Sequence, residues 1–415
     1  MFTYLEALQQ IFDQANQFTP QVCFVDHVHA IGRVLAEDLS TSSRLPDFDT
    51  SAMDGFALRS ELTLNASAER PMIFRVLGSV AAGDNIGFAN SESSREPVAY
   101  EVMTGARFPP GLDACVKLED VRVTNEGSIE ITAPISKDAN RRLAGEDFAS
   151  GTTVLTKGHV IRTEDLLCLA ALGLTKLPVF AKLRVAVIST GKELVDPDVE
   201  PSGTQIRNST QNYLIAALTS QSAQLTSVEV SHVANVGDDP SDFLKEISGA
   251  REKRCDLILT TGAISVGKFD FVARSLVEHG LEVLFQKVRI RPGKPLLFGR
   301  LEGGPFVLGL PGNPVATATG FRFFAVPLLR ALAQQSREVP LRARLSQATR
   351  KPPDTACFFK ASLRQTPEGF EVQAHANQKA SMTNPLLQTN SWIALEANAL
   401  EHVLAGTYVD VYPFG

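Results

Sequence analysis

The sequence predicts a multidomain α/β protein whose main domain is built on a parallel sheet. From Leu183 onward, apolar runs of strand length alternate with helical segments, a pattern that indicates parallel strands joined by right-handed crossovers. Runs such as "LRVAVIST" are apolar throughout, as in a sheet that helices cover on both faces. Residues 46–134 and those after Arg337 instead show short β-like runs separated by Gly, Pro and Asn. We therefore expect β-rich domains on both sides of the α/β domain.

Length and composition exclude several classes of protein. The chain has 415 residues, of which 44% are hydrophobic and 21% charged, as in a globular protein with sizeable cores. The net charge of −6 gives no reason to expect binding to nucleic acid or to a membrane surface. No apolar run approaches the roughly 20 residues of a membrane span, and the first residues lack the features of a signal peptide. The 5 cysteines are widely spaced without a C-x-x-C pair, which argues against a disulfide framework or a zinc site and favours the cytoplasm.

The predicted elements follow in order along the chain. The first 39 residues predict one or two short helices and a strand, and β-like segments such as "MIFRVLG" and "ACVKLEDVRV" come next. Helical periodicity then returns, with a helix over 164–172 that Gly173 ends. We expect four domains. They are a discontinuous helical linking domain over residues 1–45 with 135–182, a β-rich domain over 46–134, an α/β domain over 183–335 and a C-terminal β domain over 336–415.

Within the α/β domain, capping residues mark where the helices begin. Asn208 or Ser209 precedes the helical "TQNYLIAALTS", and Asp239 with Pro240 supplies the N-cap and first-turn chemistry of the next helix. Gly280 ends the helical "FDFVARSLVEH". The apolar runs "SVEVSHVANV", "CDLILTT" and "GPFVLGL" predict the strands between these helices.

Candidate chemistry gathers where three of these strands end. The first loop carries Thr190, Gly191 and Glu193; the second carries Thr260, Thr261, Gly262, Ser265, Gly267 and Asp270; the third carries Pro311, Gly312, Asn313 and Pro314. Because ligands of open parallel sheets bind at the carboxyl ends of the strands, we expect these loops to meet. Small residues let backbone N–H groups approach an anion, although glycine after a strand is also ordinary turn chemistry. Neither a G-x-G-x-x-G nor a G-x-x-x-x-G-K-[ST] motif is present.

The segment "FQKVRIRPGKPLLFG" adds positive charge to an acidic chain. It carries Lys287, Arg289, Arg291 and Lys294, and it predicts a strand that runs to Arg291 with the first three of these on one face. Such a segment is either a solvated edge strand or a clamp for phosphates or an oxyanion. The rigid "PGKP" turn favours the clamp because it would fix Lys294 in place.

Four acidic residues raise similar alternatives. Asp239 is a helix cap or a site residue, and Asp270 either caps its helix or holds a divalent cation such as Mg²⁺, which prefers oxygen ligands. Glu193 follows a strand end, where it would contact a substrate hydroxyl or amide. Asp54 stands among small and apolar residues in "FDTSAMDGFAL", which we interpret as a carboxylate held at the wall of a cleft.

Seven motifs, in this order, resemble those of the molybdopterin molybdenumtransferase family, which also includes the C-terminal domain of gephyrin. They are "SAMDGFA", "MTGARFPPGLDACVKLED", "NRRLAGEDFASG", "VISTGKELV", "TTGAISVGKFDFV", "RIRPGKPLLFG" and "GLPGNPVA". The resemblance covers essentially the whole chain. It implies a four-domain homodimer with an α/β domain of the molybdopterin-binding type and a C-terminal β-barrel. It also implies an active cleft shared between subunits, into which Asp54 would reach from the neighbouring copy.

The resemblance further implies the reaction and its residues. Members of the family transfer molybdenum from molybdate to adenylylated molybdopterin with Mg²⁺ and release AMP, and a molybdopterin adenylyltransferase is a further expected partner. Together with the loops above, it gives candidate catalytic residues Asp54, Asp147, Glu193, Asp270, Lys287 and Arg291. The candidate substrate-binding residues are Thr104, Thr190, Gly191, Asp239, Thr261, Gly262, Ser265, Gly267, Lys294, Pro311, Gly312, Asn313 and Pro314, and the candidate metal ligand, for Mg²⁺ or molybdate, is Asp270.

The chain departs from the family pattern in the second loop and in the basic segment. Ala263 stands where glycine is common, Lys268 stands where an acid is frequent, and Arg291 replaces a frequent lysine. These changes bear on substrate detail more than on the class of reaction. Two other functions remain open on the sequence: a non-catalytic molybdopterin carrier or scaffold, and a molybdopterin adenylyltransferase.

Overall fold

The computed structural model of the protein describes residues 1–85, 96–124, 127–220, 227–262 and 271–414. The chain divides into two compact units. The first, here the α/β–barrel unit, comprises Met1–Glu37, Lys157–Arg162 and Lys176–Gly415. The second, here the inserted unit, comprises Asp38–Thr156 and Thr163–Thr175. The chain therefore leaves the α/β–barrel unit after Glu37, re-enters it at Lys157–Arg162, and lies within it again from Lys176 onward.

The α/β–barrel unit is organised around a six-stranded sheet. Its order is β16 (Val228–Val236), β13 (Leu183–Thr190), β17 (Leu257–Thr261), β21 (Phe306–Leu310), β20 (Leu297–Leu301) and β18 (Leu281–Gln286). The first four strands are parallel, as the sequence predicts. Strand β20 pairs antiparallel with both of its neighbours, β21 and β18. A short turn joins β20 to β21, whereas a parallel pairing would need a crossover connection.

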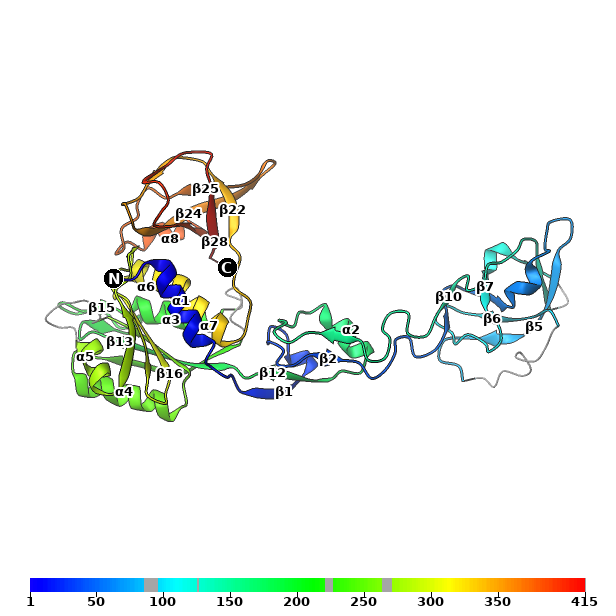
Figure 1. The fold of residues 1–415 in the computed structure, drawn as a ribbon, viewed down its shortest axis with the longest axis horizontal. Coiled ribbons are helices and arrows are strands. Elements are labelled where there is room, and N and C mark those ends of the chain that lie inside the picture. Colours follow the sequence, from blue (N-terminus) through cyan, green and yellow to red (C-terminus); the bar gives the residue numbers. More distant parts are fainter. Residues whose placement is uncertain (86–95, 125–126, 221–226, 263–270, 415) are drawn as a thin grey trace. The chain divides into compact units, whose positions relative to one another are not determined.

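Helices cover both faces of this sheet (Figure 1). One face carries α1 (Tyr4–Ala15), α3 (Ser209–Thr219), α6 (Pro314–Gly320) and α7 (Val326–Leu332), and the other carries α4 (Pro240–Glu252) and α5 (Phe271–Glu278). Successive side chains of β13 divide between the two cores: Val185 and Val187 pack with the first set, Ala186 and Ile188 with the second. The uniformly apolar strand follows from this two-sided burial.

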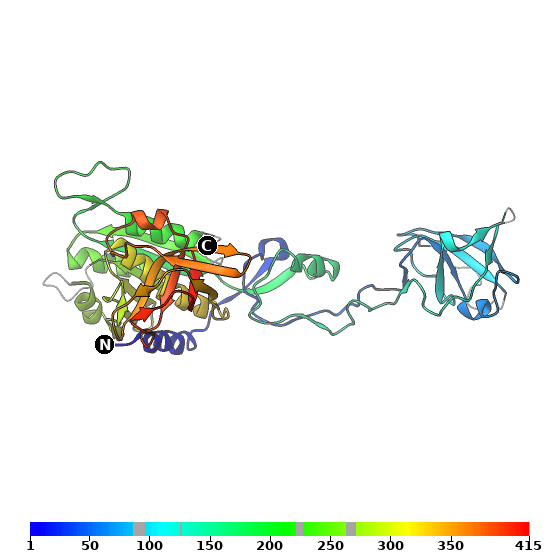
Figure 2. The ribbon, with the colours of Figure 1, turned by 90° about the horizontal axis from the view of Figure 1, so that it is seen from above.

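Helices α6 and α7 form one continuous segment, Pro314–Leu332, with a π-helical stretch over Phe321–Ala325. Contrary to the expectation from the sequence, this segment is by length and composition alone apolar enough to cross a membrane. Most of it is buried inside the unit, as is usual for the core helix of a globular domain. The N-terminal helix α1 packs against α7, and both views show it lying against this unit (Figures 1 and 2).

The C-terminal region is a closed five-stranded barrel. Its strands pair in the order β24 (Ala356–Thr366), β25 (Gly369–Ala374), β22 (Leu341–Leu345), β28 (Tyr408–Pro413) and β26 (Ser391–Leu395), and β26 pairs back with β24. Short elements complete it: β23 (Thr349–Arg350), β27 (His402–Val403) and α8 (Asn384–Leu387). The two-residue strand β19 (Ile290–Arg291) pairs with β24 and so joins the barrel to the α/β region. The predicted C-terminal β-barrel is confirmed.

The inserted unit is β-rich, as predicted. Its six-stranded sheet has the order β7 (Ala114–Lys117), β4 (Gly55–Leu58), β6 (Val98–Val102), β5 (Met72–Val80), β9 (Ser128–Ile131) and β8 (Arg122–Val123). Two small ladders and one helix accompany it: β3 (Thr50–Ser51) with β10 (Arg141–Arg142), β2 (Leu39–Ser40) with β11 (Thr153–Leu155), and α2 (Asp165–Ala171). Two further ladders belong to the α/β–barrel unit: β1 (Val22–Asp26) with β12 (Lys176–Phe180), and β14 (Leu194–Val195) with β15 (Ile206–Arg207).

Candidate functional site

Within the part of the chain that the structure describes, the first residues of the loops that follow β13, β17 and β21 lie against one another. The strands are adjacent and parallel, so these ends share one edge of the sheet. The N–H of Gly262 donates to Leu310 O at 3.3 Å, which ties the second loop to the third strand. A Cβ added to Gly262 would lie 2.4 Å from Thr190 O, and one added to Gly312 would lie 3.5 Å from the Gly262 Cα. The structure thus brings together loops that are about 50 to 70 residues apart in sequence.

Glycine is required at the centre of this contact. Gly262 has a φ of +88°, in the left-handed region that side chains disfavour, and it has no room for a Cβ beside Thr190. In the first loop, the N–H of Gly191 donates to Val236 O at 3.0 Å. The exposed side chain of Glu193 folds back over Gly191, so that a Cβ there would meet its carboxylate oxygens at 2.8 and 2.9 Å. The predicted residue Glu193 therefore lies against Gly191 in the first loop.

The hydroxyl groups at these strand ends bond within the protein. Thr190 Oγ1 donates to Thr261 O at 3.1 Å, and Thr261 Oγ1 donates to Ser189 Oγ at 3.1 Å. Thr210, at the start of α3, lies 3.4 Å from Thr261 Oγ1. All four residues are buried. These hydroxyls therefore link the strand ends to one another inside the protein.

The predicted strand through the basic segment is wrong. Strand β18 ends at Gln286, and Lys287 has a left-handed φ of 65°, which interrupts the extended backbone. Strand β19 (Ile290–Arg291) then pairs with the barrel rather than with the main sheet. The chain turns here because it passes from one sheet to another. The basic residues therefore do not share a strand face.

Two of the basic residues nevertheless border the third loop. Arg291 and Lys294 are exposed, and they line one hollow together with Pro311 and Asn313. Arg289 lines the same hollow, whereas Lys287 is absent from its lining. The turn Pro292–Gly293 between the basic residues is buried, with Gly293 at a φ of +101°. This buried turn fixes where the two cationic side chains emerge.

The barrel contributes residues to this hollow that the sequence did not indicate. Gln378, Lys379 and Ser381 line it from the loop between β25 and α8, and Val315 N donates to Ala380 O at 3.1 Å. No spacing or motif links this loop to "PGNP", which lies more than 60 residues earlier. The pairing of β19 with β24 and the Val315–Ala380 hydrogen bond bring the two regions together.

Other predicted residues of this unit have different surroundings. Asp239 is the N-cap of α4, where its carboxylate accepts hydrogen bonds from Ser241 Oγ at 2.7 Å and Ser241 N at 2.8 Å. These two hydrogen bonds lower the pKa of Asp239. Pro314 begins α6, as predicted. Ser265, Gly267 and Asp270, with the variant positions Ala263 and Lys268, lie outside the described residues.

In the inserted unit, Asp54 and Thr104 are in direct contact. One oxygen of Asp54 accepts from Thr104 N at 2.7 Å and from Thr104 Oγ1 at 2.8 Å, although the residues are 50 apart in sequence. These two hydrogen bonds lower the pKa of Asp54. Both residues are exposed, so a ligand can reach the second carboxylate oxygen. The "SAMDG" and "MTGA" motifs therefore form a single surface feature.

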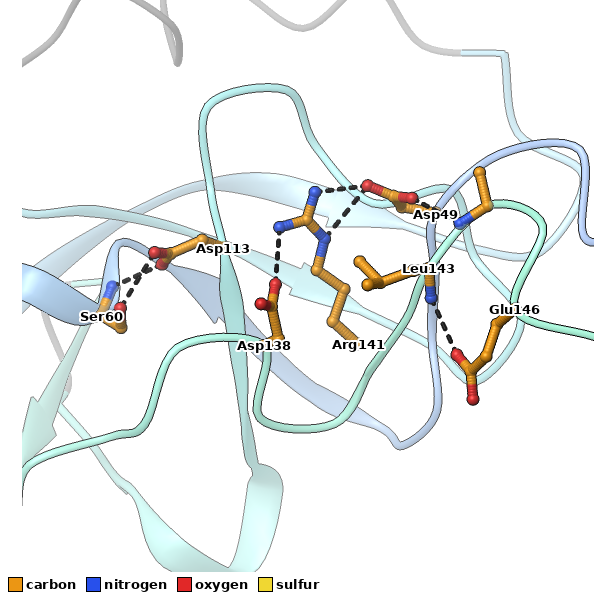
Figure 3. Close-up of polar contacts among 8 residues, drawn as sticks. Asp49, Ser60, Asp113, Asp138, Arg141, Leu143 and Glu146 are labelled. Carbon is orange, nitrogen blue, oxygen red and sulfur yellow. Dashed lines mark hydrogen bonds and ion pairs between the residues drawn. The ribbon is translucent and has the colours of Figure 1, made fainter.

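Asp147 is exposed, and the turn that carries it is held by backbone hydrogen bonds to Leu45. Its N–H donates to Leu45 O at 3.0 Å, and the Glu146 carboxylate accepts from Leu143 N at 3.0 Å (Figure 3). Strand β10, just before this turn, pairs with β3, just before the Asp54 turn. The structure thus joins the segments that carry Asp54 and Asp147 through one short ladder.

Comparison with known proteins places these features in one family. Three family models match the chain in order: the MoeA N-terminal region (domain I and II) over residues 2–173, a probable molybdopterin-binding domain over 186–331, and the MoeA C-terminal region (domain IV) over 342–414. A molybdopterin molybdenumtransferase of Synechococcus elongatus is 39% identical, with 99% of each chain covered. The chain belongs to the molybdopterin molybdenumtransferase family. It is accordingly an enzyme of molybdenum cofactor biosynthesis.

More distant members agree with this assignment. Molybdopterin molybdenumtransferases of Staphylococcus aureus (strain MRSA252) and Haemophilus influenzae are 32% and 30% identical, over 98% and 100% of this chain and 94% and 99% of theirs. A crystal structure of a molybdopterin biosynthesis MoeA protein from Pyrococcus horikoshii is 29% identical, with a TM-score of 0.83 over 100% of this chain and 99% of that one. The similarity in sequence and in structure spans all the domains, so the family's full multidomain architecture is present.

Membership in the molybdenumtransferase family raises the question of a bound cation. Among the residues that the structure describes, no group of three or more His, Cys, Asp or Glu side chains is arranged to hold a metal ion. Mg²⁺, however, is commonly held by one or two carboxylates with substrate phosphates and water. The exposed carboxylate of Glu193, in the loop that follows β13, could supply one such ligand.

Proposed function

We propose that this member of the family inserts molybdenum from molybdate into adenylylated molybdopterin, with Mg²⁺, and releases AMP. The observation that carries the proposal is the contact of the three strand-end loops beside the exposed Arg291 and Lys294. Adenylylated molybdopterin and molybdate are both anionic. A site for them needs fixed positive charge and backbone groups that can approach oxyanions closely.

The residues would share the work as follows. Arg291 and Lys294 would neutralise phosphate or molybdate oxygens, and the glycines of the loops would let the backbone approach them. Glu193, with Asp270, would hold Mg²⁺ against the phosphates, and the cation would stabilise the charge that develops as the adenylate is cleaved. Asp54 with Thr104, and Asp147, would bind or orient the pterin and the dithiolene. The roles of Lys287 and Asp239 would be indirect, through the fold of their loops.

We extend the proposal to a cytoplasmic homodimer in which each site draws on both copies. In this arrangement Asp54, Thr104 and Asp147 of one copy act with the strand-end loops of the other. A molybdopterin adenylyltransferase, as the class of enzyme that makes the adenylylated substrate, would be a functional partner. Asp54→Asn and Asp270→Asn subunits should each be inactive alone, and a mixture should regain part of the activity. Confirmed heterodimers without activity would exclude a shared site.

The reaction itself can be tested with the purified protein. Adenylylated molybdopterin, molybdate and Mg²⁺ are mixed with the enzyme, and AMP is measured by chromatography against reactions that lack molybdate or Mg²⁺. We expect AMP release that depends on both, and strongly reduced turnover in Asp270→Asn with its fold intact. Substrate binding without AMP release would instead support a carrier. Formation of adenylylated molybdopterin from molybdopterin and ATP would support an adenylyltransferase.

A further inference from the structure

Arg141 occupies an unusual position in the inserted unit (Figure 3). Its guanidinium is shared between two carboxylates: Nε and Nη2 donate to the same oxygen of Asp49, Nε at 3.1 Å, and Nη1 donates to Asp138 at 3.1 Å. The ring of Phe108 lies 5.2 Å from the guanidinium carbon. The side chain is only 19% exposed, so this ion pair is far less screened by water than a typical surface salt bridge.

Asp49 carries this interaction to the turn that bears Asp147. Its second carboxylate oxygen accepts from Ala144 N at 2.7 Å. Burial alone would raise the pKa of Asp49, but the hydrogen bonds from Ala144 and Arg141 outweigh it and hold the pKa below its usual value. Asp49 thus stays ionised and bridges Arg141 to the backbone three residues before Asp147.

The other side of Arg141 supports the turn that bears Asp54. Asp138 and Asn140 both have left-handed φ values, 60° and 51°, and the Asp138–Arg141 pair closes this tight turn. From the same turn, Asn140 O accepts from Ala52 N at 2.9 Å, two residues before Asp54. The Asn140 amide also donates to Cys115 O at 2.9 Å, which anchors the turn to the main sheet.

The Asp54 segment is also linked to the Thr104 segment. Ser51 N donates to Ala106 O at 3.0 Å, and Gly105 N donates to Ser51 O at 2.8 Å. Ser51 itself pairs with Arg141 in the β3–β10 ladder. The segments that carry Asp54, Thr104 and Asp147 therefore all connect, within two or three hydrogen bonds, to Arg141.

We propose that Arg141 is a positioning residue for the reaction, whose fork between Asp49 and Asp138 sets the placement of the Asp54 and Asp147 turns. Arg141 does not touch the substrate in this proposal. It deepens the proposed function and rests on it for the roles of Asp54 and Asp147. Its distinguishing feature is geometry: a guanidinium can reach both carboxylates at once in a fixed plane, whereas an ammonium supplies the same charge without that fork.

The test compares Arg141→Met and Arg141→Lys with a matched control, Arg122→Met. Arg122 lies in the same unit but pairs only loosely, at 3.8 Å, with Glu130, and its side chain is 82% exposed. We expect Arg141→Met to lower kcat for AMP release about tenfold to a hundredfold, because displacements near 1 Å cost that much. KM for adenylylated molybdopterin should change less than kcat, because the loops proposed to bind the phosphates lie in the other unit and keep their contacts. Arg122→Met should leave both constants unchanged.

Arg141→Lys separates positioning from charge. If the fork sets the geometry, lysine restores thermal stability but not kcat. Full recovery of kcat by lysine, or a kcat near wild type in Arg141→Met, would overturn the proposal. A fall in kcat explained entirely by a smaller folded fraction, measured by circular dichroism, would also overturn it.

Hydrogen exchange gives a readout that does not depend on the reaction. In the full-length protein, Arg141→Met should accelerate amide exchange in peptides covering 51–55 and 143–148, and Arg122→Met should not. Unchanged exchange in both peptides would contradict the positioning role. If the wild-type protein released no AMP, the proposed function would fail while this exchange result would still decide whether Arg141 orders the two turns.

Discussion

The two units hold their candidate residues by different physical means. In the α/β–barrel unit, the loops after β13, β17 and β21 meet because parallel strands end at the same edge of a sheet. In the inserted unit, the segments of Asp54, Thr104 and Asp147 are joined by individual hydrogen bonds and by the Arg141–Asp49 ion pair. The first arrangement follows from topology and the second from specific polar side chains.

This difference shows where each region is vulnerable. A site set by topology tolerates changes to single polar groups but not to the close backbone contacts on which it depends. A site set by side-chain hydrogen bonds depends on the ionisation of a few groups and therefore on pH. The four changes below test this comparison, from the largest expected effect to the smallest.

Gly262→Ala should be the most damaging change. Its Cβ would lie 2.4 Å from Thr190 O at a φ of +88°, so both the loop contact and the backbone conformation would have to change. We expect a loss of stability of about 3 kcal/mol and no measurable AMP release, checked by thermal melting and the AMP assay.

Gly203→Ala is the matched control for this change. Gly203 also has a left-handed φ, of +57°, but open space surrounds its Cβ position. Only the backbone cost of about 1 kcal/mol should appear there, with activity retained. Equal effects of the two substitutions would show that the contact between the loops is unimportant.

Arg291→Ala should weaken binding without unfolding the protein. The side chain is exposed at the hollow beside Pro311 and Asn313, so its loss removes charge but little packing. We expect KM for adenylylated molybdopterin to rise about tenfold, with a weaker dependence on salt concentration. Arg342→Ala, which breaks the ion pair with Asp410 on the barrel, should leave KM unchanged. An unaltered KM in Arg291→Ala would remove this residue from the proposed site.

Asp49 should make the order of the inserted unit depend on pH. Its pKa in the folded protein lies below the unfolded value of about 3.9. The ionised carboxylate therefore stabilises the fold above that pH, and this stabilisation is lost as the pH falls through the folded pKa. Relative to the chemical exchange rate, amide exchange in 143–148 should accelerate in the wild type as the pH falls below about 4.

The Asn variant isolates this contribution. Asp49→Asn should show faster exchange already at pH 7 and little further change on acidification. Glu61→Gln, at an exposed carboxylate of the same unit, should behave like the wild type. A wild type whose exchange in this segment showed no acid dependence beyond the chemical rate would refute the role of Asp49.

Thr104→Val should have the smallest effect. It removes one of two hydrogen bonds to Asp54 and leaves the backbone N–H in place. The pKa of Asp54 should rise toward its ordinary value, so the acid limb of the pH–kcat profile should move to higher pH. We expect kcat at neutral pH to fall only about two- to fivefold, because Asp54 is exposed. Thr124→Val, whose hydroxyl donates to Ser128 O rather than to Asp54, is the control. An acid limb that stayed in place would show that Asp54 ionisation does not limit turnover.

The sequence predicted the features that depend on neighbouring residues. Asn208 and Asp239 cap the helices they were expected to begin, and the apolar runs form strands covered on both faces. The order of these strands then brings the loops together, so the three-loop contact could be anticipated from topology alone. Helix capping and strand periodicity each depend on residues only a few positions apart, so both can be recognised in a single sequence.

The features that the sequence did not reveal depend on distant partners. Arg141 and Asp49 are 92 residues apart, and neither belongs to a motif that marks an ion pair. Lys379 and Ser381 belong to the barrel, and they line the hollow because β19 pairs with β24 of the barrel and not with the main sheet. The backbone departs from the direction of β18 at Lys287, which has a left-handed φ. A lysine in that conformation is not favoured by its own chemistry, so the tertiary pairing determines it.

The position of α1 has a consequence for how the protein is made. The helix is synthesised first, yet Tyr4 packs against Phe324 and Phe358, and Phe2 bridges to Val288. On the ribosome, the inserted unit can close soon after Thr175 emerges, whereas Tyr4 of α1 must wait for Phe324 and Phe358, which lie more than 300 residues after it in the chain. Throughout that interval the apolar side of α1 lacks the residues against which it packs in the folded protein, so this helix can be completed only late in synthesis.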